Sequence, residues 1–166
     1  MPLLISRWIF SRVVRSARAF ETESIDMYHR LADQLGGEMS CRDDFRGALC
    51  HLLEEEQMHW KLLTDAAEGK LSLEQLEHHL AKHVYTGLQE MEPLGGQDLG
   101  RWGPDLGRAL DQEEKTWVFY GNLRRMSKLP VVKKTFDVLA AMEKEHIDIL
   151  RRLLGRINED STGKRH

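Results

Sequence analysis

The chain has 166 residues, of which 41% are hydrophobic and 31% are charged. This length suits one domain, and the apolar fraction excludes a disordered chain. The formal net charge of −3 excludes a general nucleic-acid binder, whose surface would be strongly basic, so we expect no nucleic-acid partner.

Residues 1–18 contain four arginines and no acidic residue. Their order does not match a signal peptide, because arginine interrupts the apolar run and basic residues follow it. We expect residues 1–14 to extend the first helix. The alternative is a basic amphipathic segment that contacts a membrane surface.

The two cysteines, Cys41 and Cys50, are predicted to lie in one helix. Nine helical residues separate them by about 13 Å, which is too far for a disulfide. Reduced thiols fit a cytoplasmic protein, which is the localisation we expect. No stretch reaches the roughly 18 apolar residues of a transmembrane helix.

Glycine and proline residues divide the chain into four long helical segments. The first two are predicted at about residues 5–35 and 40–68. The third and fourth are predicted at about residues 105–128 and 131–157. Alternating strand patterns are weak throughout, so the sequence predicts an all-α fold.

Residues 69–104 connect the second and third helices and contain one short helix, which begins with the capping-box residues Ser72 and Gln75. Two short links and one long crossover are typical of the ferritin-like four-helix bundle. We therefore predict a single domain over residues 1–160, with a flexible polar tail at residues 158–166.

Each long helix carries a glutamate in the middle of its apolar stripe, at Glu21, Glu56, Glu113 and Glu143. Burying an ionised carboxylate without a partner costs several kcal/mol, against a fold stability of roughly 5–15 kcal/mol. Two divalent metal ions would balance four carboxylates in formal charge. The four stripes therefore predict a metal site in the core.

Two of these glutamates are followed three residues later by a histidine, so carboxylate and imidazole can reach the same ion from one helix face. The other two precede a tyrosine by seven residues. This internal repeat predicts two similar hairpins related by an approximate twofold axis. The predicted ligands are Glu21, Glu56, His59, Glu113, Glu143 and His146, and the accompanying tyrosines are Tyr28 and Tyr120.

Over residues 15–155 this pattern resembles the rubrerythrin-like di-iron domain of the ferritin-like superfamily. The resemblance implies two iron ions, Fe2+ or Fe3+, that Glu56 and Glu143 bridge or chelate. Glu21 and Glu113 would be terminal ligands, each ion would take one imidazole, and the tyrosines would line the site. Zinc or manganese can fill the same ligand set in the isolated protein.

Two features depart from rubrerythrins. The chain lacks the cysteines of the rubredoxin-like domain that delivers electrons, and Thr116 stands where some rubrerythrins place an additional carboxylate. We therefore expect electrons from a separate donor, such as a rubredoxin-like protein. We also expect a homodimer, because a long bundle leaves apolar residues exposed.

Three functions stay open. The first is a redox enzyme that acts on peroxide or dioxygen, in the manner of a peroxidase or ferroxidase. The second is a metal-binding or iron-handling protein without sustained turnover. The third is a membrane-associated di-iron hydroxylase resembling the demethoxyubiquinone hydroxylases.

Several other side chains are interpreted as peripheral. Acidic neighbours of the stripes are expected on solvated faces, and the tryptophans are expected in the core or at an interface. The histidines of the short helix are expected on its surface, with adventitious zinc or nickel binding as the alternative. These residues are Glu23, Glu54, Glu55, Glu114, Glu145, Trp60, Trp102, Trp117, His78, His79 and His83.

Overall fold

The structure is a computed structural model that describes residues 2–34, 44–82 and 102–163. These residues form five helices and no strand, which confirms the all-α prediction. None of these helices combines the length and apolar character that crossing a membrane requires. Their bounds are α1 Pro2–Gln34, α2 Asp44–Ala67, α3 Leu73–Lys82, α4 Gly103–Met126 and α5 Pro130–Gly163.

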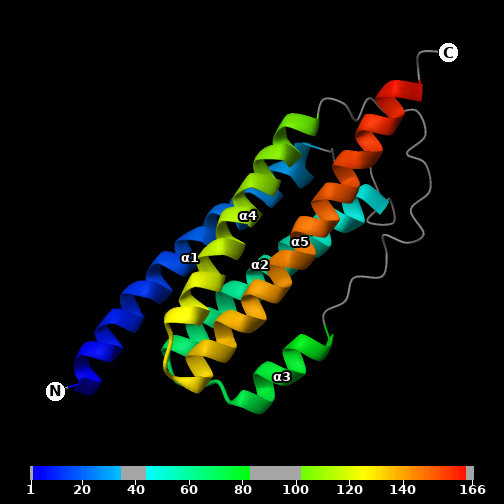
Figure 1. The fold of residues 1–166 in the computed structure, drawn as a ribbon. Helices are drawn as coiled ribbons and strands as arrows, with labels where there is room; N and C mark the ends of the chain where they lie inside the picture. The colour runs from blue at the N-terminus through cyan, green and yellow to red at the C-terminus, as the bar shows by residue number, and fades with distance from the viewer. Residues whose placement is uncertain (1, 35–43, 83–101, 164–166) are drawn as a thin grey trace.

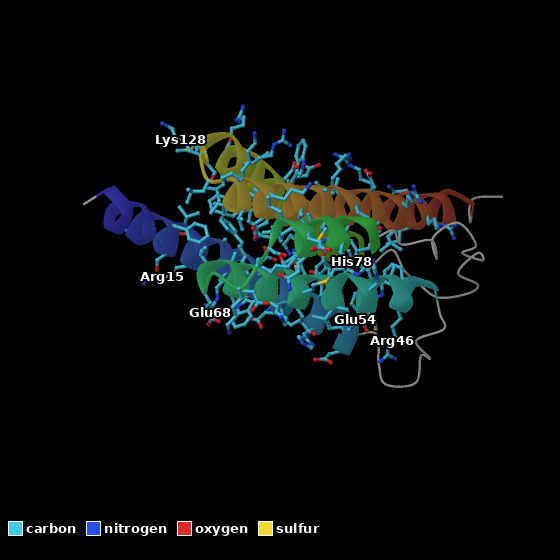
Figure 2. All side chains as sticks on the ribbon, turned by 90° about the horizontal axis from the view of Figure 1, so that it is seen from below. Arg15, Arg46, Glu54, Glu68, His78 and Lys128 are labelled. Atoms are coloured by element: carbon cyan, nitrogen blue, oxygen red, sulfur yellow. The ribbon has the colours of Figure 1, made fainter. Side chains whose placement is uncertain are left out.

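The four long helices pack as two hairpins (Figure 1). α1 lies along α2, and α4 lies along α5, while contacts of α1 with α4 and of α2 with α5 join the hairpins. α3, in the crossover, packs against α5. This is the predicted ferritin-like bundle, and exposed charged residues such as Arg15, Glu54 and Lys128 project outward from it (Figure 2).

Helix ends follow the local sequence signals. The capping box of α3 forms as predicted, because the Ser72 N–H donates to Gln75 Oε1 at 2.8 Å and the Gln75 N–H donates to Ser72 Oγ at 3.2 Å. α2 is followed by Gly69 with φ of 70°, a left-handed conformation that glycine adopts without strain. The predicted cap at Ser40 and the thiol of Cys41 lie outside the described residues.

The first and the last helix of the chain are longer than predicted. α1 begins at Pro2 rather than near residue 5, and α5 continues to Gly163 rather than ending near residue 157. The tail predicted to be flexible at residues 158–166 is therefore helical as far as Gly163. The physical reason is that neither proline nor glycine occurs between Ile157 and Gly163, so polarity alone does not end the helix.

A polar layer divides the hydrophobic core into two clusters. The first cluster includes Leu49 and Leu52 of α2 with Leu106 of α4, and the second includes Leu63 of α2 with Leu139 of α5. In each long helix the glutamate of the apolar stripe stands between residues of the first cluster and residues of the second. The four carboxylates therefore lie between the two apolar clusters.

Two residues lie differently from the prediction. Trp117 lies four residues after Glu113 and three before Tyr120, a spacing that predicts an inward position, but it is 42% exposed and the adjacent Thr116 is buried instead. Glu55 was expected on a solvated face but is 6% exposed. α2 packs against both α1 and α5, so a wide face of this helix is covered.

Substitution of a core leucine tests this packing. Leu139 is fully buried, so Leu139→Ala should lower the free energy of unfolding by about 2–5 kcal/mol, measured by urea denaturation. Leu129 is 56% exposed, and Leu129→Ala should change it by about 0.5 kcal/mol or less. Equal effects of the two substitutions would contradict this description of the core.

Candidate metal centre

The six predicted ligands meet in the polar layer between the two apolar clusters. α1 and α4 contribute one glutamate each, and α2 and α5 contribute a glutamate and a histidine three residues apart. Each of the six side chains is at most 1% exposed. They are Glu21 of α1, Glu56 and His59 of α2, Glu113 of α4, and Glu143 and His146 of α5.

Each histidine faces carboxylates from both hairpins. His59 Nδ1 lies 3.3 Å from Glu21 Oε2 and 3.2 Å from Glu143 Oε1. His146 Nδ1 lies 2.8 Å from Glu56 Oε1. The two imidazole rings stack with centroids 5.1 Å apart and an interplanar angle of 15°.

The remaining distances repeat the same arrangement for each histidine. His59 Nδ1 is 3.7 Å from Glu56 Oε2, the carboxylate three residues before it, and His146 Nδ1 is 3.6 Å from Glu143 Oε2. His146 Nδ1 is also 3.7 Å from Glu113 Oε2. The glutamates of α2 and α5 thus approach both histidines, whereas those of α1 and α4 each approach one. This is the approximate twofold arrangement that the internal repeat predicts.

The two tyrosines connect the hairpins. The Tyr28 hydroxyl of α1 donates to Glu113 Oε1 of α4 at 2.5 Å, and the Tyr120 hydroxyl of α4 donates to Glu21 Oε1 of α1. Both tyrosines are fully buried. Each terminal glutamate is therefore oriented by a tyrosine of the opposite hairpin, so the site is complete only when the hairpins pack together.

Ten buried side-chain atoms of this layer have no hydrogen-bond partner of suitable geometry, although they approach one another closely. They include both nitrogens of each histidine and both carboxylate oxygens of Glu56 and Glu143. Buried polar atoms are almost always satisfied, so such a group points to a missing partner. One ligand atom from each of these four residues lies within 4.8 Å of the others. Their carboxylate oxygens and imidazole nitrogens fit a metal ion.

Without metal, the layer reaches charge balance through its protons. Burial raises the pKa of Glu21 and of Glu113 well above 4.5. Burial would also raise the pKa of Glu56, but the neighbouring histidines outweigh it and lower this pKa. Burial and the charge of Glu56 would raise the pKa of Glu143, but hydrogen bonds with Glu113 and then with the two histidines lower it.

The histidines have the complementary shift. Burial alone would lower the pKa of His59 and His146, but the surrounding carboxylates raise both well above 6.5. Two neutral carboxylic acids, two carboxylates and two imidazoliums then sum to zero charge. Two divalent ions on six deprotonated ligands would also give zero, so the binding of two such ions would release four protons.

Family comparison supports this reading of the site. Residues 105–166 match the family model of rubrerythrin. The match covers most of α4 and α5 and confirms the resemblance predicted from the sequence. The α1–α2 hairpin, which lies outside the matched residues, supplies the other half of the buried layer. No curated protein and no solved structure matches the chain.

Two small residues beside the predicted ligands also follow the internal repeat, which the sequence analysis did not recognise. Ser24 and Thr116 each lie three residues after the single glutamate of their helix, and both are 1% exposed. The Thr116 hydroxyl donates to the Gln112 carbonyl of its own helix at 3.1 Å. Aligning the two glutamate-to-tyrosine segments, Glu21–Tyr28 and Glu113–Tyr120, would have revealed the pair.

One histidine of the short helix lies outside this buried layer. His78 is exposed on α3. The side chain of His79 and the whole of His83 lie outside the described part of the structure, so the alternative of adventitious metal binding there remains a prediction.

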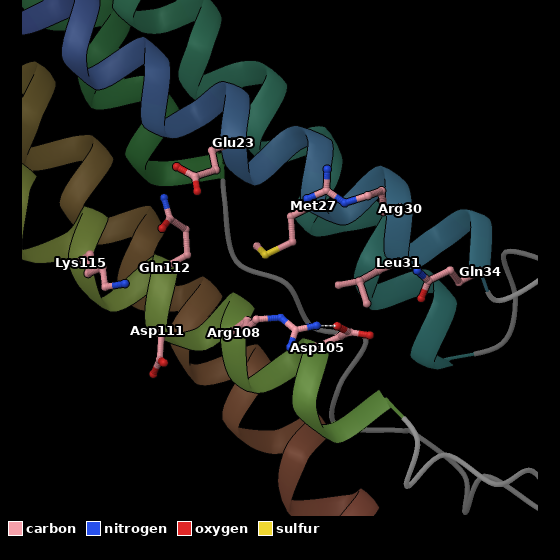
Figure 3. A pocket seen from close by; sticks show the side chains of 10 residues that line it. All are labelled: Glu23, Met27, Arg30, Leu31, Gln34, Asp105, Arg108, Asp111, Gln112 and Lys115. Carbon is pink, nitrogen blue, oxygen red and sulfur yellow. Dashed lines mark hydrogen bonds and ion pairs between the residues drawn. The ribbon is translucent and has the colours of Figure 1, made fainter.

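A pocket of about 320 Å³ opens between α1 and α4 (Figure 3). Met27 and Leu31 project into it from α1, and Gln112 lines it from α4. Tyr28 and Glu113, which follow Met27 and Gln112 in the sequence, are fully buried and are not among the side chains that line this pocket.

The shifted pKa values of the buried layer predict how stability depends on pH. Groups with a raised pKa stabilise the fold below their ordinary pKa and lose this contribution as the pH rises through the raised value. The melting temperature of the metal-free protein should therefore fall as the pH rises above the ordinary pKa values of these groups, and metal should oppose this fall. Calorimetric titration in buffers of different ionisation enthalpy should detect up to four protons released per two divalent ions. Metal binding without proton release would contradict the charge assignment.

Removal of one tyrosine hydroxyl tests the link between hairpins. Tyr28→Phe leaves a buried carboxylate oxygen of Glu113 without its donor, and Tyr120→Phe does the same to Glu21. Each should lower the free energy of unfolding of the metal-free protein by about 1–3 kcal/mol. Thr22→Ala, at an exposed position of α1, is the control. Markedly unequal effects of the two tyrosine substitutions would argue against the twofold equivalence.

Proposed function

We propose that this chain is a di-iron carboxylate protein that reacts with peroxide or dioxygen and takes electrons from a separate donor. The observation that carries the proposal is the buried set of four carboxylates and two imidazoles with unsatisfied oxygen and nitrogen atoms. The match of residues 105–166 to rubrerythrin supports it. Reduction of peroxide and oxidation of ferrous iron are the two forms of this chemistry.

The donor set favours iron among the transition metals. Carboxylate and imidazole ligands without thiolate suit iron, and zinc or manganese can compete for the same ligands. Glu56 and Glu143, which face both histidines, would hold both ions. Glu21 with His59 and Glu113 with His146 would each complete one ion. When bound, iron supplies the electrons that reduce the oxidant.

The chain's own residues would control protons and water at this site. Burial, and then the charge of Glu113, raises the pKa of Tyr28, which keeps its hydroxyl protonated against that carboxylate. The Tyr120 hydroxyl donates its proton in a hydrogen bond to Glu21. The apolar clusters on both sides exclude bulk water. A small oxidant would enter through the pocket between α1 and α4, whose lining residues Met27 and Gln112 directly precede Tyr28 and Glu113 in the sequence.

An iron-handling role without sustained turnover is the second candidate. The observation that favours it is Thr116, which stands where some rubrerythrins carry another carboxylate and whose hydroxyl is bonded to its own helix. One fewer carboxylate would leave the ions with fewer anionic ligands during redox change. The two candidates differ in whether oxidised iron is reduced again.

Isosteric substitution tests the ligand assignment. Glu56→Gln and Glu143→Gln should each reduce bound iron from two ions per chain to one or fewer, because each removes a ligand that faces both histidines. Glu54→Gln, two residues before Glu56 and exposed, should keep both ions. Iron content and the optical absorption of the ferric pair are the measurements. Equal losses in all three variants would overturn the assignment.

Reaction kinetics separate the two candidate functions. Ferrous protein should be mixed without oxygen with hydrogen peroxide, and then supplied with a rubredoxin-like reductant. Rapid oxidation followed by repeated re-reduction would support the enzyme. A single oxidation without recycling would instead support iron handling. Inertness toward both peroxide and dioxygen would refute the redox proposal.

A further inference from the structure

The outer side of α4 carries large apolar side chains that the fold leaves uncovered. Trp117 is 42% exposed and Val118 is 53% exposed. One turn further along, Gly121 has open space where a side chain would stand. Hollows of about 320 Å³ and 450 Å³ flank Trp117 and Val118. This face therefore offers both projecting side chains and spaces that could receive them.

Charge along the same face of α4 changes sign at its centre. Asp111 lies seven residues before Val118 and Arg125 lies seven residues after it, so the three share one side of the helix. Both charged residues are exposed. Asp111 forms no ion pair within the described ranges, and Arg125 donates to the uncharged side chain of Asn122. Between Asp111 and Val118 the same side also carries Glu114, which pairs with Arg151 of α5 at 2.7 Å, and the exposed Lys115. The strip thus begins at the acidic Asp111, has Val118 at its centre and ends at the basic Arg125.

Such a strip is complementary to itself in the antiparallel direction. A twofold axis at Val118 would set two copies of α4 antiparallel and bring Asp111 opposite the partner's Arg125, twice in the same contact. Val118 and Trp117 would then meet their counterparts at the centre, next to the hollows. A twofold interface requires this property, because the same patch serves on both subunits.

The other hairpin does not repeat this face. Val118 lies five residues after Glu113, and the residue five after Glu21 is the exposed Asp26. A charged residue at this position of a similar helix is therefore compatible with the fold. The apolar centre belongs to α4, although the inward ligand pattern is shared by both hairpins.

We propose that the face of α4 centred on Trp117 and Val118 is a twofold interface with a second copy of this chain. The proposal stands on exposure, hollows and charge order, and does not depend on the metal assignment. It identifies a surface for the homodimer that the sequence analysis expected.

Sedimentation equilibrium of the full chain tests the interface. The unaltered protein should be a dimer, and Val118→Asp should raise the dimer dissociation constant by about tenfold or more. Met126→Asp is the matched control, because Met126 is 78% exposed on the same helix outside the strip, and it should leave the constant unchanged. A monomeric unaltered protein, or equal weakening by both substitutions, would overturn the proposal.

A charge exchange gives a second test that does not depend on any loss of folding. Asp111→Arg and Arg125→Asp should each weaken the dimer, because like charges then face one another. The double variant restores opposite charges in both pairs and should recover most of the lost affinity. Failure of the double variant to recover, with helix content unchanged by circular dichroism, would count against this geometry. Iron content measured in parallel separates a failed interface from a failed metal site.

Discussion

The structure depends on the cost of placing four carboxylates and two imidazoles in one buried layer. Any of these groups left charged and unpaired would cost several kcal/mol, which is comparable to the stability of a domain. The layer is stable only because its charges cancel, either through retained protons or through bound cations. Each apolar cluster beside it excludes water and so strengthens the attraction among these charges. Packing of the core and the balance of its charges are therefore linked in this fold. A bound metal ion would balance the charges without leaving buried polar atoms unsatisfied.

The hairpins are interdependent for the same reason. Tyr28 of α1 serves Glu113 of α4, and Tyr120 of α4 serves Glu21 of α1, so neither hairpin can satisfy its own terminal glutamate. His59 likewise approaches Glu143 of the other hairpin, and His146 approaches Glu56. An isolated hairpin would expose these groups to water and lose the geometry. The contacts that complete the ligand set are the same contacts that join the two halves of the bundle.

Sequence periodicity was sufficient to predict the four long helices and the residues that face inward between them. A buried carboxylate on an apolar stripe is a strong signal, because it conflicts with the solvation of charge. The repeated spacing pointed to six residues that the structure brings together in one buried layer. The sequence predicted burial less well for residues whose exposure depends only on the side of the helix that they occupy. Trp117 is apolar and has the spacing of an inward residue, but it is exposed and the adjacent Thr116 is buried instead. Glu55 was expected on a solvated face because it is charged. It is buried because α2 packs against both α1 and α5.

The pairing of tyrosines across hairpins could not be predicted from either segment alone, since it depends on how far α1 and α4 are offset along their axes. Once that offset is known, the limits of the repeat become informative. It holds at the inward positions, where Ser24 matches Thr116 and Ala17 matches Ala109, both pairs being buried. It fails at the outward position, where Asp26 corresponds to Val118. The requirements of the buried layer act equally on both hairpins and explain the inward agreement. They place no constraint on the outer face of α4, so its exposed apolar residues call for a separate physical cause, such as contact with another molecule.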